Sequence, residues 1–214
     1  MKSWLAEALG TALISMTVVG SAFMAASLTD DQALHLLINA VATALVLFVV
    51  IYLFAPISGA HFNPVVTIIF TLKKKLTFQD SFSYLSAQFI GGVSGTILAN
   101  LMFTSDVAVL STINRATSAN FLGELIATAV LLLIILLSIE HGRSSAIAYL
   151  VPAWIGSAYF STVSTSFANP AITFARSFSA NGTRINLTST AAFIAVQLVG
   201  GACALGLVKV LAKK

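Results

Sequence analysis

The chain has 214 residues, of which 58% are apolar and only 8% are charged, and its mean hydropathy is +0.97. Soluble domains carry about 25% charged residues, so this composition excludes an ordinary soluble fold and indicates an integral membrane protein. The net charge of +4 needs no nucleic-acid partner, because basic residues gather in the links on one side of the predicted spans.

Six long apolar stretches follow one another along the chain, and a helix needs about 20 such residues to cross a bilayer. We predict spans at residues 4–26, 34–54, 81–103, 120–139, 145–165 and 190–210. The links are too short to fold separately, so we expect one all-α domain over residues 1–214 with no cofactor and no metal site. The first stretch could also be a signal peptide, but its motif "EALGTALI" has a counterpart in the fourth, which favours a helix of the fold.

The basic residues predict the orientation. With a cytoplasmic N-terminus, the outer links hold three of them, Arg115, Arg176 and Arg184, whereas the inner links and ends hold eight: Lys2, Lys73, Lys74, Lys75, Arg143, Lys209, Lys213 and Lys214. Positive charge favours the cytoplasmic side. We therefore expect both termini in the cytoplasm and a location in the inner or plasma membrane.

Three short motifs occur once in each half of the chain and in the same order. They are "EALGTALI" from Glu7 and "ELIATAVL" from Glu124, "NPVVT" from Asn63 and "NPAIT" from Asn169, and "QFIGG" from Gln88 and "QLVGG" from Gln197. Each half holds three predicted spans, so the second copy enters the membrane from the opposite side. The sequence predicts inverted repeats over about residues 1–105 and 118–214, with the two Asn-Pro segments facing each other.

Asn-Pro is a helix-starting pair, because asparagine is a strong N-cap and proline fits the first helical turn. The helices after Asn63 and Asn169 have room for about ten residues, half of a membrane span. Such segments are tolerated at membrane depth only within protein or beside a wet cavity. We expect two re-entrant half-helices whose N-termini and asparagine amides meet near the bilayer centre, where they offer hydrogen-bond donors to neutral solutes and repel cations.

These motifs resemble those of the major intrinsic proteins, the aquaporins and aquaglyceroporins: "SGAHFNPVVT", "FANPAITFAR", the paired glutamates and the six-span duplication. The resemblance implies six tilted helices and two re-entrant half-helices around one pore, in a homotetramer. It implies that Glu7 and Glu124 brace the re-entrant loops and that His61 lines the cytoplasmic entrance. The pore boxes would be Asn63, Pro64 and Val65 in the first half and Asn169, Pro170 and Ala171 in the second.

The sequence departs from this family at the selectivity filter. The family's usual arginine, three residues after the second asparagine, is replaced by Ile172, and an arginine follows one helical turn later at Arg176, which we expect at the outer mouth. Counting back from the boxes without gaps puts Thr43, Ser157 and Ser166 at the other filter positions. All are small and polar, so the opening is predicted to be wide.

We therefore predict a membrane channel that passes water or small uncharged solutes, with polyols and undissociated metalloid acids as candidates, and that excludes ions and protons. Tyr159, Phe160 or Arg176 could instead refill the opening and leave a water pore. The alternative is an ion-coupled transporter, but it would need an acidic residue where the half-helices meet, and the boxes have none. An enzyme is not expected, since no catalytic set of side chains lies at matched depth. The expected partners are the lipid bilayer, water and small neutral solutes.

Overall fold

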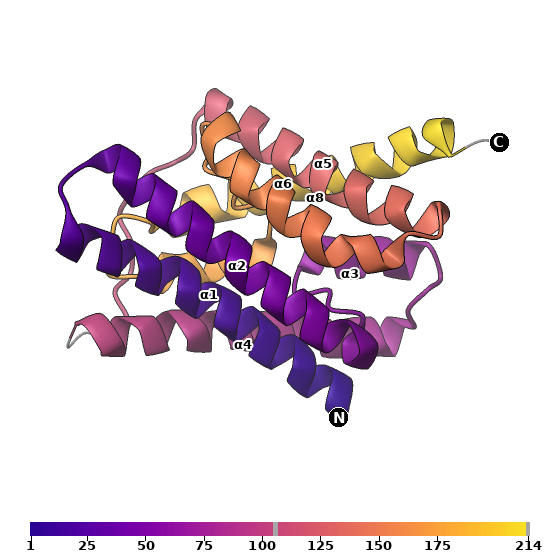
Figure 1. The fold of residues 1–214 in the computed structure, drawn as a ribbon, viewed down its shortest axis with the longest axis horizontal. Coiled ribbons are helices and arrows are strands. Elements are labelled where there is room, and N and C mark those ends of the chain that lie inside the picture. Colours follow the sequence, from indigo (N-terminus) through magenta and orange to yellow (C-terminus); the bar gives the residue numbers. More distant parts are fainter. Residues whose placement is uncertain (105–106, 213–214) are drawn as a thin grey trace.

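The computed structural model describes residues 1–104 and 107–212, and these residues form helices without any β-strand (Figure 1). The helices in chain order are α1 (Lys2–Leu28), α2 (Gln32–Ser58), α3 (Pro64–Leu72), α4 (Phe78–Phe103), α5 (Ser118–Glu140), η1 (Ser144–Ala146), α6 (Ile147–Ser161), α7 (Pro170–Ala175), η2 (Arg176–Phe178) and α8 (Leu187–Leu211). The all-α architecture with two short half-helices agrees with the sequence prediction.

Five of the described helices, α1, α2, α4, α5 and α8, are long and apolar enough to cross a membrane. The remaining predicted span, residues 145–165, differs from the prediction because α6 has only 15 residues and ends at Ser161. At about 1.5 Å per residue, α6 rises about 22 Å, less than the hydrocarbon core. The chain leaves the helix early because residues 162–169 must turn back toward the middle of the protein to start α7.

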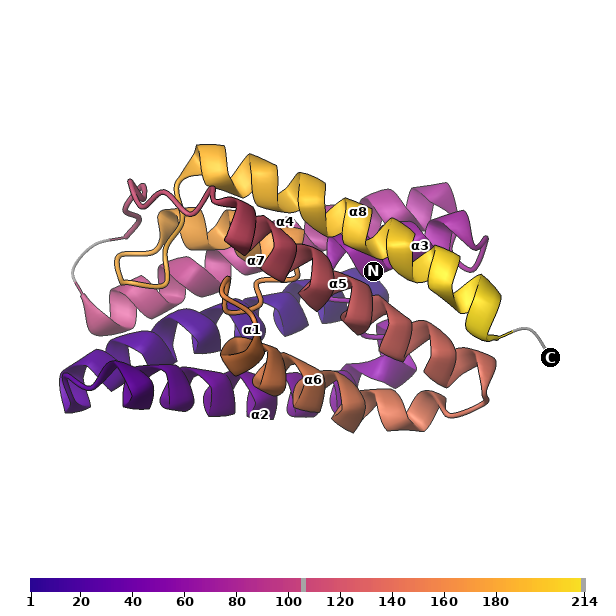
Figure 2. The same cartoon turned by 90° about the horizontal axis from the view of Figure 1, so that it is seen from above.

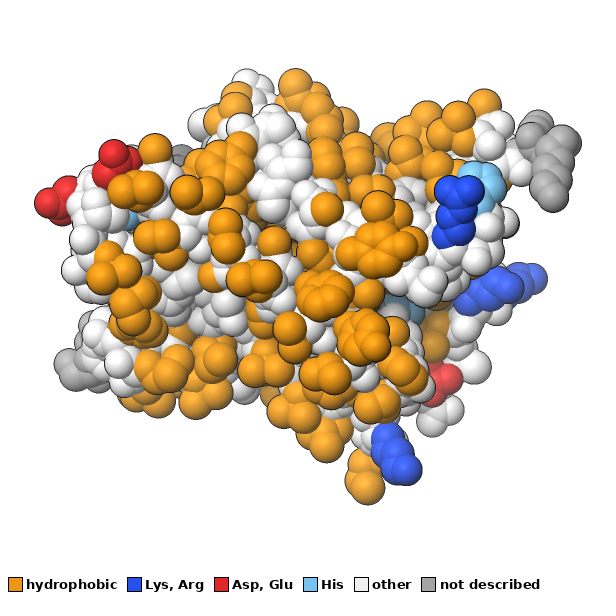
Figure 3. Space-filling model, viewed as in Figure 1, with side chains coloured by type: hydrophobic (Ala, Val, Ile, Leu, Met, Phe, Trp, Pro, Cys, Tyr) orange, Lys and Arg blue, Asp and Glu red, His pale blue; other side chains and the backbone are white. Residues whose placement is uncertain are grey.

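The surface is apolar around its middle and charged at its two ends (Figure 3). The start of α1 and the end of α8 lie at one end, which we call the termini end; the opposite end is the far end (Figure 1). Large apolar side chains such as Leu45, Tyr52 and Leu53 on α2 are more than half exposed. Such a surface fits lipid rather than water. Lys213 and Lys214 of the predicted basic set lie outside the described residues.

The two halves pack by equivalent contacts. In the first half α1 packs against α4 and α2, and in the second half α5 packs against α8 and α6 (Figure 2). A Cβ added at Gly91 of α4 would lie 2.2 Å from the carbonyl oxygen of Ala8, and one added at Gly200 of α8 would lie 2.8 Å from that of Leu125. These glycines therefore let the helix backbones approach closely, a common device in membrane bundles.

Candidate functional site

The two short helices begin at the Asn-Pro pairs. Asn63 caps α3, with its Oδ1 accepting a hydrogen bond from Val65 N at 2.9 Å. Asn169 caps α7, with its Oδ1 accepting from Ala171 N at 3.0 Å. In both helices proline occupies the first turn, where its missing N–H costs no hydrogen bond. The asparagine oxygens are thus used locally, and the amide nitrogens face away from the helix.

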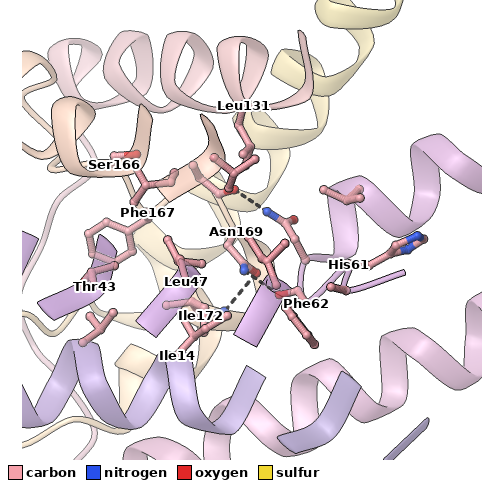
Figure 4. Close-up of a pocket in the computed structure, with 18 of the residues that line it drawn as sticks. Ile14, Thr43, Leu47, His61, Phe62, Leu131, Ser166, Phe167, Asn169 and Ile172 are labelled. Atoms are coloured by element: carbon pink, nitrogen blue, oxygen red, sulfur yellow. Dashed lines mark hydrogen bonds between the residues drawn. The ribbon is translucent and has the colours of Figure 1, made fainter. Parts of the chain in front are cut away.

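Each asparagine amide bonds to the loop of the other half. Asn63 Nδ2 donates to Ala168 O at 2.8 Å, and Asn169 Nδ2 donates to Phe62 O at 2.8 Å. The two bonds are equivalent, one made by each half of the chain. They bring together segments that are more than 100 residues apart (Figure 4). An amide nitrogen carries two hydrogens, so each asparagine keeps one further donor.

The loops before both asparagines have an unusual backbone. Ala60 and Phe62, three and one residues before Asn63, have φ of 53° and 48°, and Ser166 and Ala168, at the same distances before Asn169, have φ of 53° and 45°. Residues with a Cβ avoid this left-handed region at a cost of roughly 1–2 kcal/mol each. The surrounding structure must therefore hold both loops in place.

Two buried glutamates hold them. Glu7 accepts hydrogen bonds from His61 N at 3.0 Å and from Phe62 N at 2.7 Å. Glu124 accepts from Phe167 N at 2.8 Å and from Ala168 N at 2.8 Å. Both glutamates are fully buried. Their N–H partners would otherwise lack acceptors, so the carboxylates fix the direction of the loop carbonyls.

A glutamine and a threonine complete each brace. Gln88 Nε2 donates to Glu7 Oε2 at 2.7 Å and to Thr67 Oγ1 at 2.9 Å. In the second half, Gln197 Nε2 donates to Glu124 Oε2 at 2.6 Å and to Thr173 Oγ1 at 3.0 Å. No role was predicted from the sequence for these four residues. The repeats contain a pattern that could have indicated the threonines: in each repeat a threonine stands four residues after the asparagine of the Asn-Pro pair.

A central hollow passes the point where the two asparagines meet. Its lining combines polar residues of the loops, including Asn63, Asn169 and Ser166, with apolar side chains such as Ile51 and Leu131. In Figure 4 Asn169 lies between His61 on one side and Thr43, Ser166 and Phe167 on the other.

Two further hollows continue this one toward the protein ends. The hollow at the termini end shares His61 with the central hollow and reaches Lys73 and Glu140. The far-end hollow shares Tyr159 and Arg176 with it. The three hollows therefore follow one another from end to end, meeting at His61 and at the Tyr159–Arg176 pair.

The comparisons with known proteins agree with this geometry. The family model described as major intrinsic protein matches residues 1–165. The chain belongs to the major intrinsic protein family. It is 43% identical over 204 residues to a protein of Rhizobium meliloti (strain 1021) named aquaglyceroporin AqpS, covering 95% of this chain and 87% of that relative. Over 101 residues it is 39% identical to a probable aquaporin TIP2-2 of Arabidopsis thaliana, covering 46% of this chain and 40% of that relative.

A solved structure has the same fold. The X-ray structure of the aquaglyceroporin from Plasmodium falciparum superposes with a TM-score of 0.75 and covers 97% of this chain and 94% of that one. The two sequences are only 19% identical, so this likeness concerns the fold. This member of the major intrinsic protein family therefore has the aquaporin-like fold that its motifs predict, and the family is one of channels.

The predicted filter residues of this major intrinsic protein do not all lie at the hollow. Thr43, Ser166 and Ile172 line it, but Ser157 is exposed on the outer face of α6 and lines none of the three hollows described above. The prediction for Ser157 disagrees with the structure because counting without gaps ignores the loop between α6 and Asn169. Tyr159 takes the inward position instead, one turn after Ile155 on the same helix face.

Tyr159 fills space that the sequence suggested was open. Its side chain is 4% exposed, and its hydroxyl lies 3.0 Å from Thr43 Oγ1 in a hydrogen bond. The hydroxyl of Ser166 is buried without a hydrogen-bond partner among the described residues. The Tyr159 ring, the hydrogen-bonded hydroxyls of Tyr159 and Thr43, and the unpaired hydroxyl of Ser166 thus belong to residues that line the same hollow.

The remaining predicted residues divide into those that line the path and those that pack behind it. His61 lines the path at the termini-end junction, with its Nδ1 at 3.1 Å from Thr67 Oγ1. Arg176 lines the junction at the far end, with its Nε donating to Thr183 O at 2.7 Å. The other members of the Asn-Pro boxes are buried but lie behind the hollow: Pro64, Val65, Pro170 and Ala171.

Proposed function

We propose that the three hollows form one continuous pore through which water and small uncharged solutes cross the membrane passively. The observation that carries this proposal is the meeting of Asn63 and Asn169 inside the line of hollows. Each amide has one donor committed to the opposite loop and one hydrogen left for the oxygen of a passing solute. The boxes would thus bind neutral hydroxyl groups in a fixed orientation.

The chemistry of the wall supports rapid and neutral passage. The hollow offers polar contacts along the two loops, whereas residues such as Ile14, Val18 and Ile135 offer none. A solute that forms few hydrogen bonds along its path is bound weakly enough to leave. A cation would lose its hydration and would face the N-termini of α3 and α7, which carry partial positive charge. The pore would therefore exclude ions and protons.

The filter supports a solute of limited size. Four large side chains line the hollow: Tyr159, Phe167, Ile172 and Arg176. The opening is therefore narrower than the small filter residues predicted from the sequence would make it. Ser166 also lines the hollow, and its buried hydroxyl has no hydrogen-bond partner among the described residues. The name of the relative, aquaglyceroporin AqpS, supports glycerol-sized polyols as the solute of this chain. Undissociated metalloid acids of similar size are the second candidate. We propose that Thr43, Tyr159, Ser166, Ile172 and Arg176 together set the selectivity.

The arrangement in the membrane is part of the proposal. The described basic residues at the termini end, including Lys2, Arg143 and Lys209, outnumber those at the far end, which supports cytoplasmic termini. The equivalent contacts of α1 with α4 and of α5 with α8 support a single domain built from inverted repeats. Family membership supports a homotetramer, and we propose the inner or plasma membrane as its location.

Proteoliposome light scattering tests this function with a variant of Tyr159. Liposomes with the protein should shrink faster than empty ones in impermeant sucrose, and should shrink and then re-swell in glycerol. The change Tyr159→Ala removes the aromatic ring from the filter and should raise the rate of glycerol re-swelling several-fold. Tyr149→Ala is the matched control, because Tyr149 lies on the same helix but is 57% exposed and lines none of the three hollows.

Two outcomes would contradict the proposal. If the protein accelerates neither shrinkage nor re-swelling over empty liposomes, the hollows are not a conducting pore. If glycerol flux saturates and depends on a proton or sodium gradient, the protein is an ion-coupled carrier instead. Equal effects of Tyr159→Ala and Tyr149→Ala would show that Tyr159 does not form part of the filter.

A further inference from the structure

The hollow at the far end carries two arginine side chains. Arg115 comes from the segment between α4 and α5, and Arg176 comes from η2 after the second Asn-Pro box. His35 of α2 and Asn181 also line this hollow, which we call the arginine vestibule. It contains no acidic side chain among the residues that line it.

Both arginines hold the loop at 182–184, but with one edge only. Arg115 donates from Nε to Arg184 O at 2.9 Å and from Nη2 to Gly182 O at 3.0 Å. Arg176 donates from Nε to Thr183 O at 2.7 Å. A guanidinium group has five N–H donors in a planar fork. The loop contacts therefore explain the position of both side chains but use only part of their hydrogen-bonding capacity.

The terminal nitrogens of Arg176 are the unused part. The residue is only 3% exposed, yet neither Nη1 nor Nη2 donates a hydrogen bond to any described residue. Its guanidinium carbon lies 3.5 Å from the centre of the Phe167 ring, and that of Arg115 lies 5.5 Å from the same ring. Stacking on the ring fixes the plane of the Arg176 fork, and the fork borders both the vestibule and the central hollow.

The residues that line the vestibule carry two guanidinium charges and no carboxylate. Neither arginine forms an ion pair with a described residue; the described ion pair, Lys73 with Glu140, lies at the termini end. Glu124 is the carboxylate that interacts electrostatically with both arginines, and its oxygens are occupied by the loop N–H groups and Gln197. Asp31, at the same end, caps α2 and does not line the vestibule. Among the vestibule lining and Glu124, two guanidinium charges therefore face one carboxylate, and the buried Arg176 needs a further partner for its charge.

We infer that the arginine vestibule binds a small oxyanion with one negative charge, of the carboxylate class. Two oxygens of such an anion fit the free fork of Arg176, in the bidentate geometry that guanidinium groups favour, and Arg115 supplies the second charge. The bound anion lies over the junction formed by Tyr159 and Arg176, so it partly closes the path to the central hollow. This site is separate from the Asn-Pro boxes, and its binding can be measured without any conduction.

Thermal unfolding of the purified full-length protein in detergent tests the site. Tm is measured against increasing sodium acetate and, separately, sodium chloride at the same ionic strength and pH. A ligand that binds only the folded state raises Tm. We expect acetate to raise Tm in a saturable way and chloride to have a smaller effect, because chloride cannot span the fork.

Two variants and a control locate the effect. Arg176→Lys keeps the charge but removes the fork, and Arg115→Gln removes one charge; each should lower the apparent acetate affinity at least about tenfold, as the loss of one charge-assisted hydrogen bond does. Since Arg115 also holds the 182–184 loop, Arg115→Gln could lower Tm by itself, and the comparison is therefore the acetate-dependent shift within each variant. Arg143→Gln, an exposed arginine at the other end, should keep the full shift.

Three outcomes would overturn the inference. They are an acetate effect no larger than that of chloride, no saturable effect of either salt, and a full acetate shift in both vestibule variants. Loss of the shift in Arg143→Gln would also overturn it, because the effect would then be general screening of positive charge. None of these results bears on sucrose and glycerol permeation, so failure here leaves the channel proposal standing.

Discussion

The change Glu124→Gln tests whether the buried glutamates position the re-entrant loops. Glutamine keeps the shape of the side chain but replaces one acceptor oxygen with a donor group. The carboxylate of Glu124 accepts from Phe167 N and Ala168 N at 2.8 Å each and from Gln197 Nε2 at 2.6 Å. The best orientation of the new amide keeps its oxygen toward Ala168 and Gln197, so the Phe167 N–H faces another donor.

The expected loss of stability follows from one hydrogen bond removed at a buried site. A hydrogen bond to a charged group contributes roughly 1.5–3 kcal/mol, and a buried donor left unpaired costs about 1–3 kcal/mol. These terms overlap, and removal of a buried charge offsets part of them, so we expect a net destabilisation of about 2–3 kcal/mol. The left-handed residues Ser166 and Ala168 lose the anchoring bond of the Phe167 N–H that lies between them. Their carbonyls should then leave the wall of the hollow, and water permeability should fall several-fold.

The measurements are Tm in detergent and the rate of shrinkage of proteoliposomes in sucrose. Glu140→Gln is the matched control for Tm, because Glu140 lies at the end of the same helix and is exposed. Glu7→Gln should repeat the effect in the first half, where His61 N and Phe62 N donate to Glu7 at 3.0 Å and 2.7 Å. If Glu124→Gln keeps both the wild-type Tm and the wild-type water permeability, the brace does not position the loop and the reasoning fails.

Two further predictions concern the filter and the packing. In a Cys203→Ser background, Ser166→Cys should make water permeability sensitive to mercurials, because Ser166 lines the hollow, whereas Ser157→Cys should not. Mercurial block of both variants, or of Ser157→Cys alone, would contradict the position of Tyr159 in the filter. Gly91→Ala should lower the free energy of unfolding by about 1–3 kcal/mol or more, because its Cβ would lie 2.2 Å from Ala8 O. Gly206→Ala is the control and should have little effect on Tm, because no atom lies within 4 Å of its added Cβ. Equal Tm values for the two variants would contradict the close packing of α1 and α4.

Much of the fold could be predicted from the sequence because its causes are local. Hydropathy over about 20 residues marks a span wherever it occurs. The pairs Asn63-Pro64 and Asn169-Pro170 start helices by their own chemistry. The repeated motifs also predicted which segments meet, because an inverted duplication puts equivalent residues opposite one another.

The filter could not be predicted in the same way, because helix phase is lost across an irregular loop. Between Ser161 and Asn169 the chain passes three left-handed residues, Thr165, Ser166 and Ala168, so counting back from Asn169 does not give the face of α6. That counting selected Ser157, although the pore side carries Tyr159. The spacing of Val151, Ile155 and Tyr159, four residues apart, was the available signal for the inward face.

The contacts between the halves explain why the site needs both of them. A Cβ added at Gly201 of α8 would lie 2.5 Å from Val65 of α3, and one added at Gly92 of α4 would lie 3.2 Å from the carbonyl oxygen of Ala171. Each re-entrant helix thus packs on the last helix of the opposite half. Each asparagine amide likewise donates to the opposite loop. A half-chain would have the glutamate that braces its loop but would lack one of the two long helices against which its re-entrant segment packs. The asparagine pair therefore forms only when the two repeats fold together.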